Sequence, residues 1–213
     1  MGRIQSPRLF YFLVSCFIIA VAAGSRLTGH EHEFYEMNII LIGYRCSGKT
    51  VVGKILSNEL GRHFFDTDAL IEEKAGCSID RLVCEKGWAH FREMEKRGIE
   101  ALSMADNLVI ATGGGVVANA ENLKKLKENG WMVWLYGTPE VLKARMDKDQ
   151  KAGKLRPCIS GTDPSDEIVQ ILKERTELYH RAGDCVVDTN RALPDQVARD
   201  IIKALPSKLQ RTD

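Results

Sequence analysis

The sequence lacks an excess of charge of either sign. Its 213 residues contain 30 lysines and arginines against 29 aspartates and glutamates, which leaves a net charge of +1 at neutral pH. Proteins held to nucleic acid or to anionic membranes by electrostatics present a field of one sign. The composition therefore predicts neither nucleic acid nor a membrane surface as a partner.

Cysteine and histidine patterns typical of disulfide frameworks and zinc sites are also missing. The six cysteines stand at positions 16, 46, 77, 84, 158 and 185; no two form a C-x-x-C pair, and none has a histidine at zinc-like spacing. We therefore predict reduced thiols and no metal site built from these residues. Cys46 is the thiol whose oxidation would matter most, because it lies in the loop motif described below.

The sequence has no apolar run of the length that spans a bilayer. The longest, residues 9–23, has 15 residues, whereas a spanning helix needs about 20. Arg3 and Arg8 precede this run and small residues follow it, so the segment resembles a secretory signal. Three interpretations of residues 1–36 stay open: a cleaved signal, a short membrane anchor, or an upstream extension that is not translated. We favour the third, because Met37 stands directly before the first predicted strand.

From Met37 onward, apolar strands alternate with helices. Strands are predicted at 38–42, 63–66, 108–111, 131–135 and 185–187. Helices are predicted over 52–60, 69–75, 78–86, 88–105, 119–129, 165–179 and 194–205, together with one that begins at Pro139 and gives way to a polar stretch over 147–163. Gly61 and Gly130 are expected to close the helices before them. This alternation predicts a single α/β domain, residues 37–205, followed by a polar tail, 206–213.

One motif is highly specific. Residues 43–50 read Gly-Tyr-Arg-Cys-Ser-Gly-Lys-Thr and match G-x-x-x-x-G-K-[ST], the loop that wraps nucleotide phosphates. Glycines let backbone N–H groups approach the phosphates, and the following helix N-terminus adds positive potential. Lys49 can reach the β- and γ-phosphates, and Thr50 can offer its hydroxyl to Mg²⁺. Because a strand precedes the loop and a helix follows it, a chance match in a turn is the weaker interpretation.

Two further motifs follow predicted strands. Asp66-Thr67-Asp68 ends the second strand, and Gly113-Gly114-Gly115 follows the third. Ligands of α/β folds lie beyond the carboxyl ends of the strands, so both motifs are expected beside the phosphate loop. Two carboxylates at this spacing can serve Mg²⁺ and a substrate hydroxyl, and consecutive glycines suit a backbone that passes close to a ligand. The alternatives are a solvated acidic turn and a flexible glycine turn.

Taken together, the motifs resemble the shikimate kinase family over residues 37–205. The matching elements are the phosphate loop, Asp66-Thr67-Asp68, Phe91-Arg92-Glu93-Met94-Glu95, the three glycines, Arg156-Pro157, Glu174-Arg175 with Tyr179, and Val187-Asp188-Thr189-Asn190. The resemblance implies transfer of the ATP γ-phosphoryl group to the 3-hydroxyl of shikimate, with Mg²⁺, on the route to chorismate and aromatic amino acids. It also implies a P-loop kinase fold: a five-stranded parallel sheet of order 2-3-1-4-5 flanked by helices, with a mobile lid. We expect a monomer with no obligate protein partner, in the cytoplasm, where an ATP-using enzyme finds its substrates.

The resemblance also implies the site residues. The ATP site would comprise Gly43, Cys46, Ser47, Gly48, Lys49, Thr50, Val51, Arg145, Arg156 and Arg191, with Arg145 and the Asn190-Arg191 turn near the adenine and Arg156 on the lid. Thr50 and Asp66 would hold Mg²⁺, and Lys49, Asp68 and Arg156 would be catalytic, with Asp68 accepting the proton of the attacking hydroxyl. The substrate site would comprise Asp68, Arg92, Gly113, Gly114, Gly115 and Arg175. In it the two arginines would clamp the carboxylate, Gly114 would offer its backbone to a ring hydroxyl, and Glu95 would hold the arginines.

The chemistry of these residue types agrees with the roles. Planar guanidinium groups bind a carboxylate through paired hydrogen bonds, and phosphoryl transfer needs positioning and charge neutralisation above all. For Arg92, which stands beside two glutamates, plain surface ion pairing is the alternative.

Two other functions stay open. One is a gluconate-type or nucleoside monophosphate kinase, and the set of Asp68, Arg92, three glycines and Arg175 disfavours it because that set fits a small polyhydroxy carboxylic acid. The other is a non-catalytic sensor of the metabolite, which need not keep Lys49, Thr50, Asp68 and Arg156 together. The chain departs from the family pattern at Cys46, at Cys158-Ile159 and in a lengthened lid. These departures leave the reaction class unchanged and bear on nucleotide affinity and lid kinetics.

Overall fold

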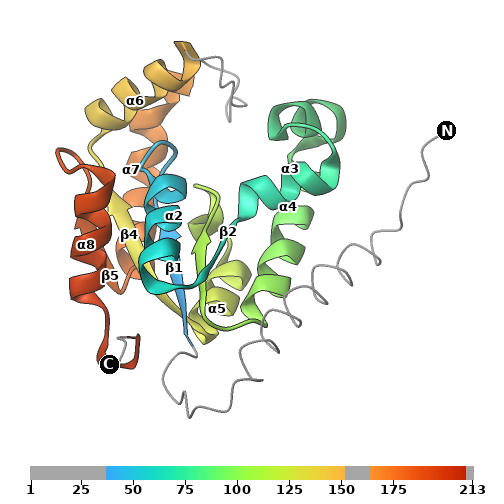
Figure 1. Ribbon diagram of the computed structural model, residues 1–213. Helices are drawn as coiled ribbons and strands as arrows, with labels where there is room; N and C mark the ends of the chain where they lie inside the picture. The colour runs from blue at the N-terminus through green and yellow to red at the C-terminus, as the bar shows by residue number, and fades with distance from the viewer. Residues whose placement is uncertain (1–36, 152–163, 210–213) are drawn as a thin grey trace.

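The predicted sheet is present. The structure, a computed structural model, describes residues 37–151 and 164–209 (Figure 1). Over these ranges it contains a five-stranded sheet of order β2-β3-β1-β4-β5, and every strand pairing is parallel. The strands are β1 Asn38–Ile42, β2 His63–Asp66, β3 Leu108–Ala111, β4 Gly130–Tyr136 and β5 Cys185–Asp188. β1 is central, so the loop that follows it begins in the middle of the carboxyl edge.

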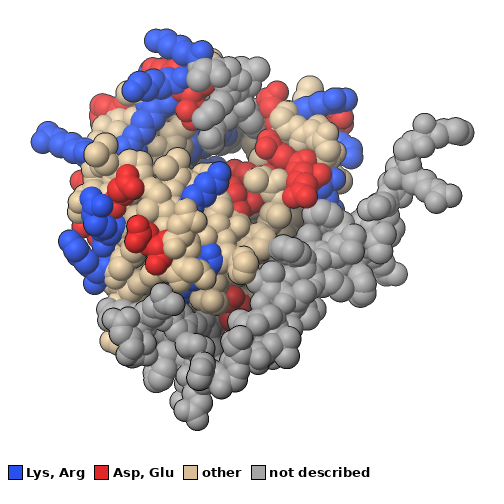
Figure 2. All heavy atoms as spheres, viewed as in Figure 1, with Lys and Arg blue, Asp and Glu red and all other residues tan. Residues whose placement is uncertain are grey.

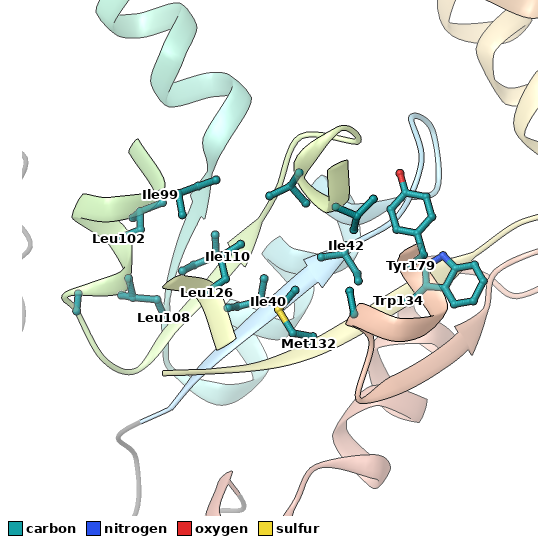
Figure 3. Close-up of a cluster of buried hydrophobic side chains, with 14 residues drawn as sticks. Ile40, Ile42, Ile99, Leu102, Leu108, Ile110, Leu126, Met132, Trp134 and Tyr179 are labelled. Carbon is teal, nitrogen blue, oxygen red and sulfur yellow. The ribbon is translucent and has the colours of Figure 1, made fainter. Parts of the chain in front are cut away.

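Helices bury both faces of this sheet (Figure 1), and Figure 3 shows the core cluster on one of them. Successive side chains of β1 point to opposite faces: Ile39 and Leu41 join one core cluster, and Ile40 and Ile42 join the other. The first cluster is closed by α2 Lys49–Leu60 and α8 Pro194–Ala204, and the second by α4 Ile79–Ser103, α5 Ala120–Glu128 and α7 Pro164–Ala182. Burial on both faces explains why the strands are apolar throughout instead of alternating.

Two smaller packing units complete the domain. α3 Thr67–Ala75 packs on the first part of α4 through Ile71, Leu82, Phe91 and Met94. α6 Pro139–Lys151 packs on α7 through Leu142, Met146, Ile168, Ile171 and Leu172, and Tyr44 of the phosphate loop joins this cluster. Short turns of 3₁₀ helix, η1 Val116–Ala118 and η2 Ser207–Leu209, follow β3 and α8.

Several predicted boundaries hold. Gly61 caps α2 with φ 63°, and its N–H donates to Ser57 O. The predicted break between helices over 78–86 and 88–105 falls at Gly87, whose φ of 79° and ψ of 166° interrupt α4. The four cysteines in the described ranges are free thiols, as predicted for them, whereas Cys16 and Cys158 lie outside those ranges.

Two boundary predictions were wrong. Gly130 does not close a helix but begins β4, after α5 ends at Glu128. A Cβ at Gly130 would clash with the Ile40 side chain and lie 2.6 Å from Leu126 O, so glycine is required there by packing. The polar stretch expected from residue 147 is helical as far as Lys151, because Lys148, Gln150 and Lys151 are good helix formers and the two lysines favour the last turn.

Both ends of the described domain are anchored by Arg62, a largely buried residue. Its guanidinium donates to Met37 O (2.9 Å) and to Leu209 O (3.4 Å). Leu209 is fully buried in the cluster beside α8, so packed structure continues past residue 205 into the expected tail. Within the described residues, none of the helices combines the length and apolarity needed to cross a membrane.

Candidate active site

The loop between β1 and α2 has a backbone that glycine makes possible. Gly43 and Gly48 have φ of 142° and 98°, and a Cβ at Gly43 would lie 2.6 Å from Leu135 O. Cys46 also has a positive φ of 60°, a conformation that residues other than glycine, asparagine and aspartate adopt only rarely. No side chain caps the N-terminus of α2. The N-terminal amides of α2 and the loop together form the kind of site that binds phosphate.

Lys49 is held over this loop. Its ammonium donates to Gly43 O (2.8 Å) and Tyr44 O (2.7 Å), and lies 3.4 Å from Ser47 Oγ. The backbone therefore fixes the position of the positive charge before any anion arrives, which lowers the cost of ordering a long side chain on binding.

Thr50 and Asp66 meet beside the loop. The Thr50 hydroxyl donates to Asp66 Oδ2 (2.7 Å), while Asp66 Oδ1 accepts from the amides of Asp68 (3.0 Å) and Ala69 (3.3 Å) and so caps α3. A hydroxyl and a carboxylate are oxygen donors of the type that Mg²⁺ prefers, and Mg²⁺ in kinases is held by one or two side chains plus phosphates. Within the described ranges there is no cluster of three or more His, Cys, Asp or Glu that could hold a metal ion. The donor set fits Mg²⁺.

The three glycines after β3 carry the acidic side of the site. Gly113 N donates to Thr67 Oγ1 (2.9 Å), which ties this segment to the Asp-Thr-Asp turn. A Cβ at Gly113 would lie 2.7 Å from Asp68 Oδ1 and 3.0 Å from Glu95 Oε1. None of the three glycines has positive φ. Glycine is therefore required here because other groups come very close to this backbone. These groups include side chains of the site itself.

The same segment carries the two predicted arginines. A Cβ at Gly115 would lie 2.7 Å from Arg92 Nη2, and Arg175 Nη1 donates to Gly114 O (3.1 Å). Arg92 is fixed by Glu95, which is 1% exposed and accepts from Arg92 Nη1 (2.8 Å). Its guanidinium also lies 5.1 Å from the centre of the Phe91 ring, within cation–π range. The Arg92 side chain is 35% exposed, so it is only partly buried, but it is anchored by a buried carboxylate, which a plain surface ion pair lacks.

The site lies in a hollow. Figure 2 shows the surface recessed between the α3–α4 part and the rest of the domain, with acidic atoms visible inside. A separate cavity of about 330 Å³ lies between α6, α7 and the end of β4, and none of the predicted site residues lines it. Its walls are mainly apolar, including Trp134, Leu142 and Leu172, which does not suit a triphosphate.

The residues predicted to lie near adenine are also gathered at one place. Arg145 of α6 donates to Thr189 O, to Thr189 Oγ1 (3.2 Å) and to Cys46 O (3.4 Å). Asn190 Oδ1 accepts from Thr138 N (2.8 Å), which fixes the turn before Arg191. Val51 is half exposed at the start of α2. Arg156 and the part of the expected lid that follows Lys151 lie outside the described residues.

Sequence reasoning missed two features of this site. One is the Thr67 hydroxyl as acceptor for Gly113, and the signal in the sequence was its position between two aspartates predicted to be functional. The other is Tyr179, which was noted only as part of a motif. Its hydroxyl donates to Gly114 O (2.5 Å).

Replacing Gly113 by alanine is expected to lower kcat/KM by about five- to 150-fold, as overpacking of about 1–3 kcal/mol implies. The new methyl group would collide with Asp68 and Glu95. Steady-state kinetics measures the loss. Gly98→Ala is the matched control, because a Cβ there meets nothing within 4 Å. Parental kcat/KM in Gly113→Ala would show that this close packing does not matter for the reaction.

The fold and the site together define a class. The chain is a P-loop small-molecule kinase. It has a phosphate loop at the central strand, a Thr–Asp pair of oxygen donors, and a carboxylate and two guanidinium groups around a glycine segment. Comparison with known proteins agrees. The family model for shikimate kinase matches residues 45–206. The shikimate kinase of Syntrophus aciditrophicus is 38% identical over 191 residues, covering 86% of this chain and 97% of that protein.

Two further relatives agree with this match. The shikimate kinase of Nitratidesulfovibrio vulgaris is 42% identical over 149 residues, or 70% of this chain and 85% of that protein. The solved structure of shikimate kinase from Acinetobacter baumannii in complex with shikimate matches with a TM-score of 0.73 and 33% identity, over 79% of this chain and 92% of that one. The chain belongs to the shikimate kinase family.

Proposed function

We propose that this protein is an ATP-dependent shikimate kinase that phosphorylates the 3-hydroxyl of shikimate and releases shikimate 3-phosphate and ADP. The observation that carries the proposal is the convergence of Asp68, Glu95, Arg92 and Arg175 on three glycines. This arrangement offers two cations to a carboxylate and an anion to a hydroxyl, which is the chemistry of a hydroxy acid.

The phosphate loop is assigned to ATP. Amides of the loop and of the start of α2 bind the phosphates, and Lys49 supplies charge to the β- and γ-phosphates. Arg145 and the turn through Arg191 border the adenine. Arg156 would add a cation at the transferred group. Thr50 and Asp66 would hold Mg²⁺, which when bound would neutralise phosphate charge.

The glycine segment is assigned to the acceptor. Arg92 and Arg175 bind the carboxylate, and Glu95 fixes the Arg92 guanidinium. Gly114 offers its backbone to a ring hydroxyl, whereas the Gly113 N–H already donates to Thr67 Oγ1. The oxygen of the 3-hydroxyl attacks the γ-phosphorus, and Asp68 accepts the proton of that hydroxyl. The bond from the γ-phosphorus to the β–γ bridging oxygen breaks, and ADP leaves. The protein's contribution is positioning and electrostatic stabilisation, which dominate phosphoryl transfer.

A panel of acceptors tests this function. Purified protein with Mg-ATP is offered shikimate, gluconate and a nucleoside monophosphate in separate reactions, and ADP release is followed. Turnover should be far faster with shikimate. Turnover with gluconate or the nucleotide instead would assign the fold to another kinase. Shikimate binding without ADP release would make the protein a sensor.

We further propose that the catalytic unit begins at Met37, acts as a monomer, and works in the cytoplasm, where ATP and the acceptor are found. A shortened protein that starts at Met37 is expected to fold and to keep the parental kcat, because Met37 O is already bound by Arg62 and the site lies at the opposite edge of the sheet from the start of β1. Circular dichroism and ADP release check this. Insolubility or lost activity would show that residues 1–36 belong to the working enzyme.

A further inference from the structure

Tyr179 is a fully buried tyrosine whose hydroxyl reaches the glycine segment. It donates to Gly114 O (2.5 Å), and Arg175, one turn earlier on α7, donates to the same oxygen (3.1 Å). The Tyr179 ring stacks on Trp134, with ring centres 5.8 Å apart and an interplanar angle of 16°. Figure 3 shows these two rings side by side at the end of the core cluster. One helix therefore places two donors, four residues apart, on one carbonyl.

That carbonyl needs external restraint. The peptide between Gly114 and Gly115 joins residues without side chains, whose dihedral angles are the least restricted of any residue type. Arg175 alone would be a weak restraint on this peptide, because its side chain is long and flexible and is also needed to bind the carboxylate of the acceptor. The tyrosine hydroxyl sits on a rigid ring held by Trp134. It can therefore fix the peptide, and the peptide in turn fixes the Arg175 guanidinium.

The phenol is suited to this role at all physiological pH values. Burial raises the pKa of Tyr179 well above its ordinary range. The hydroxyl therefore keeps its proton and remains a donor.

We propose that Tyr179 is a positioning residue for Arg175. Through Gly114 O it fixes the position of the Arg175 guanidinium and so determines the affinity for the carboxylate of the acceptor. In this role Tyr179 acts through Gly114 O and not through a contact of its own with substrate or nucleotide. The inference rests on the proposed function, because it takes Arg175 as the carboxylate ligand.

The first test is Tyr179→Phe, which removes the hydroxyl and keeps the ring that stacks on Trp134. The KM for shikimate should rise about fivefold, within the roughly two- to twelvefold that one lost hydrogen bond represents. The kcat and the KM for ATP should stay within about twofold of the parent. Tyr136→Phe is the matched control. The Tyr136 ring also packs on Trp134, with ring centres 5.3 Å apart, but Tyr136 is not one of the predicted site residues. It should leave all three constants unchanged.

Two further measurements separate positioning from general support. In an Arg175→Ala background, Tyr179→Phe should add little further loss, because it acts through the arginine that is already gone. With the neutral carboxamide of shikimate as acceptor, the Tyr179→Phe penalty should shrink to less than about twofold.

The outcomes are distinct. A parent enzyme that does not turn over shikimate would refute the proposed function. An active parent with an unchanged Tyr179→Phe variant would refute only the role of Tyr179. Equal penalties on acid and carboxamide, or full additivity with Arg175→Ala, would also overturn it. A Tyr179→Phe protein that is unfolded by circular dichroism would make the hydroxyl a stability element instead.

Discussion

The Asp68→Asn variant is expected to lose about 10²- to 10⁴-fold in kcat, the usual cost of removing a general base. Asparagine keeps the size of the side chain and one oxygen acceptor, but it cannot take the proton of the attacking hydroxyl. Asp68 stands in the first turn of α3, directly after β2, and faces the space that Gly113 leaves open. The measurement is kcat at saturating ATP and shikimate.

A matched control separates chemistry from helix electrostatics. Asp80 is the first-turn carboxylate of α4 and is exposed. Asp80→Asn removes the same favourable interaction with a helix N-terminus, of about 0.3–1 kcal/mol, without touching the site. It should lower stability slightly and leave kcat unchanged. If Asp68→Asn retained kcat within a few-fold of the parent, Asp68 would not be the base.

The second large effect is expected at the two arginines. Arg92→Ala and Arg175→Ala should each cost about 2–5 kcal/mol in kcat/KM, the range for breaking a desolvated charge contact. Each variant leaves one guanidinium facing the carboxylate alone. The double variant should cost less than the sum, because both groups act on one anion. The KM for ATP should change little, since the phosphate loop is a separate element.

The arginine variants need controls for stability. Arg92→Ala would leave Glu95, which is 1% exposed, as a buried charge without its partner, and this is costly in itself. Arg92→Lys keeps a positive charge near Glu95 but loses the planar fork, so its loss in kcat/KM reports on the geometry of recognition. Arg97→Ala on the same helix removes an exposed i,i+4 pair with Glu93 and should have little effect.

The carboxamide of shikimate lacks the negative charge that the arginines are proposed to bind, so comparing it with the acid tests that interaction. The parent should strongly prefer the acid, and the arginine variants should discriminate far less. Equal use of acid and amide by the parent would show that these arginines do not recognise the carboxylate.

Much of the fold was predictable because local patterns determine it. The apolar strands, the glycine signal at Gly61 and the break between the helices over 78–86 and 88–105 are properties of short segments, and the structure has them as predicted. Gly130 was misread because its requirement comes from the Ile40 side chain, ninety residues away in sequence, and no local rule contains that contact. The helical extension to Lys151 was missed because polar residues fit loops and helix ends equally well.

For the candidate site, the sequence indicated which residues belong together but not how they are arranged. The order of the motifs indicated that Asp68, Arg92 and Arg175 act together. The sequence could not show that all three meet at the glycine segment, which depends on how α3, α4 and α7 pack around the end of β3. Nor could it show that the hydroxyl of Tyr179 lies on Gly114 O, since 65 residues separate them.

The most direct test of the account is the position of the transferred phosphate. The parent protein is incubated with Mg-ATP and shikimate, and the product is examined by ³¹P and ¹H nuclear magnetic resonance. The account predicts one phosphoryl group, coupled to the proton at carbon 3, with one ADP formed for each product molecule. Phosphate on another hydroxyl, or no phosphorylated product, would contradict it.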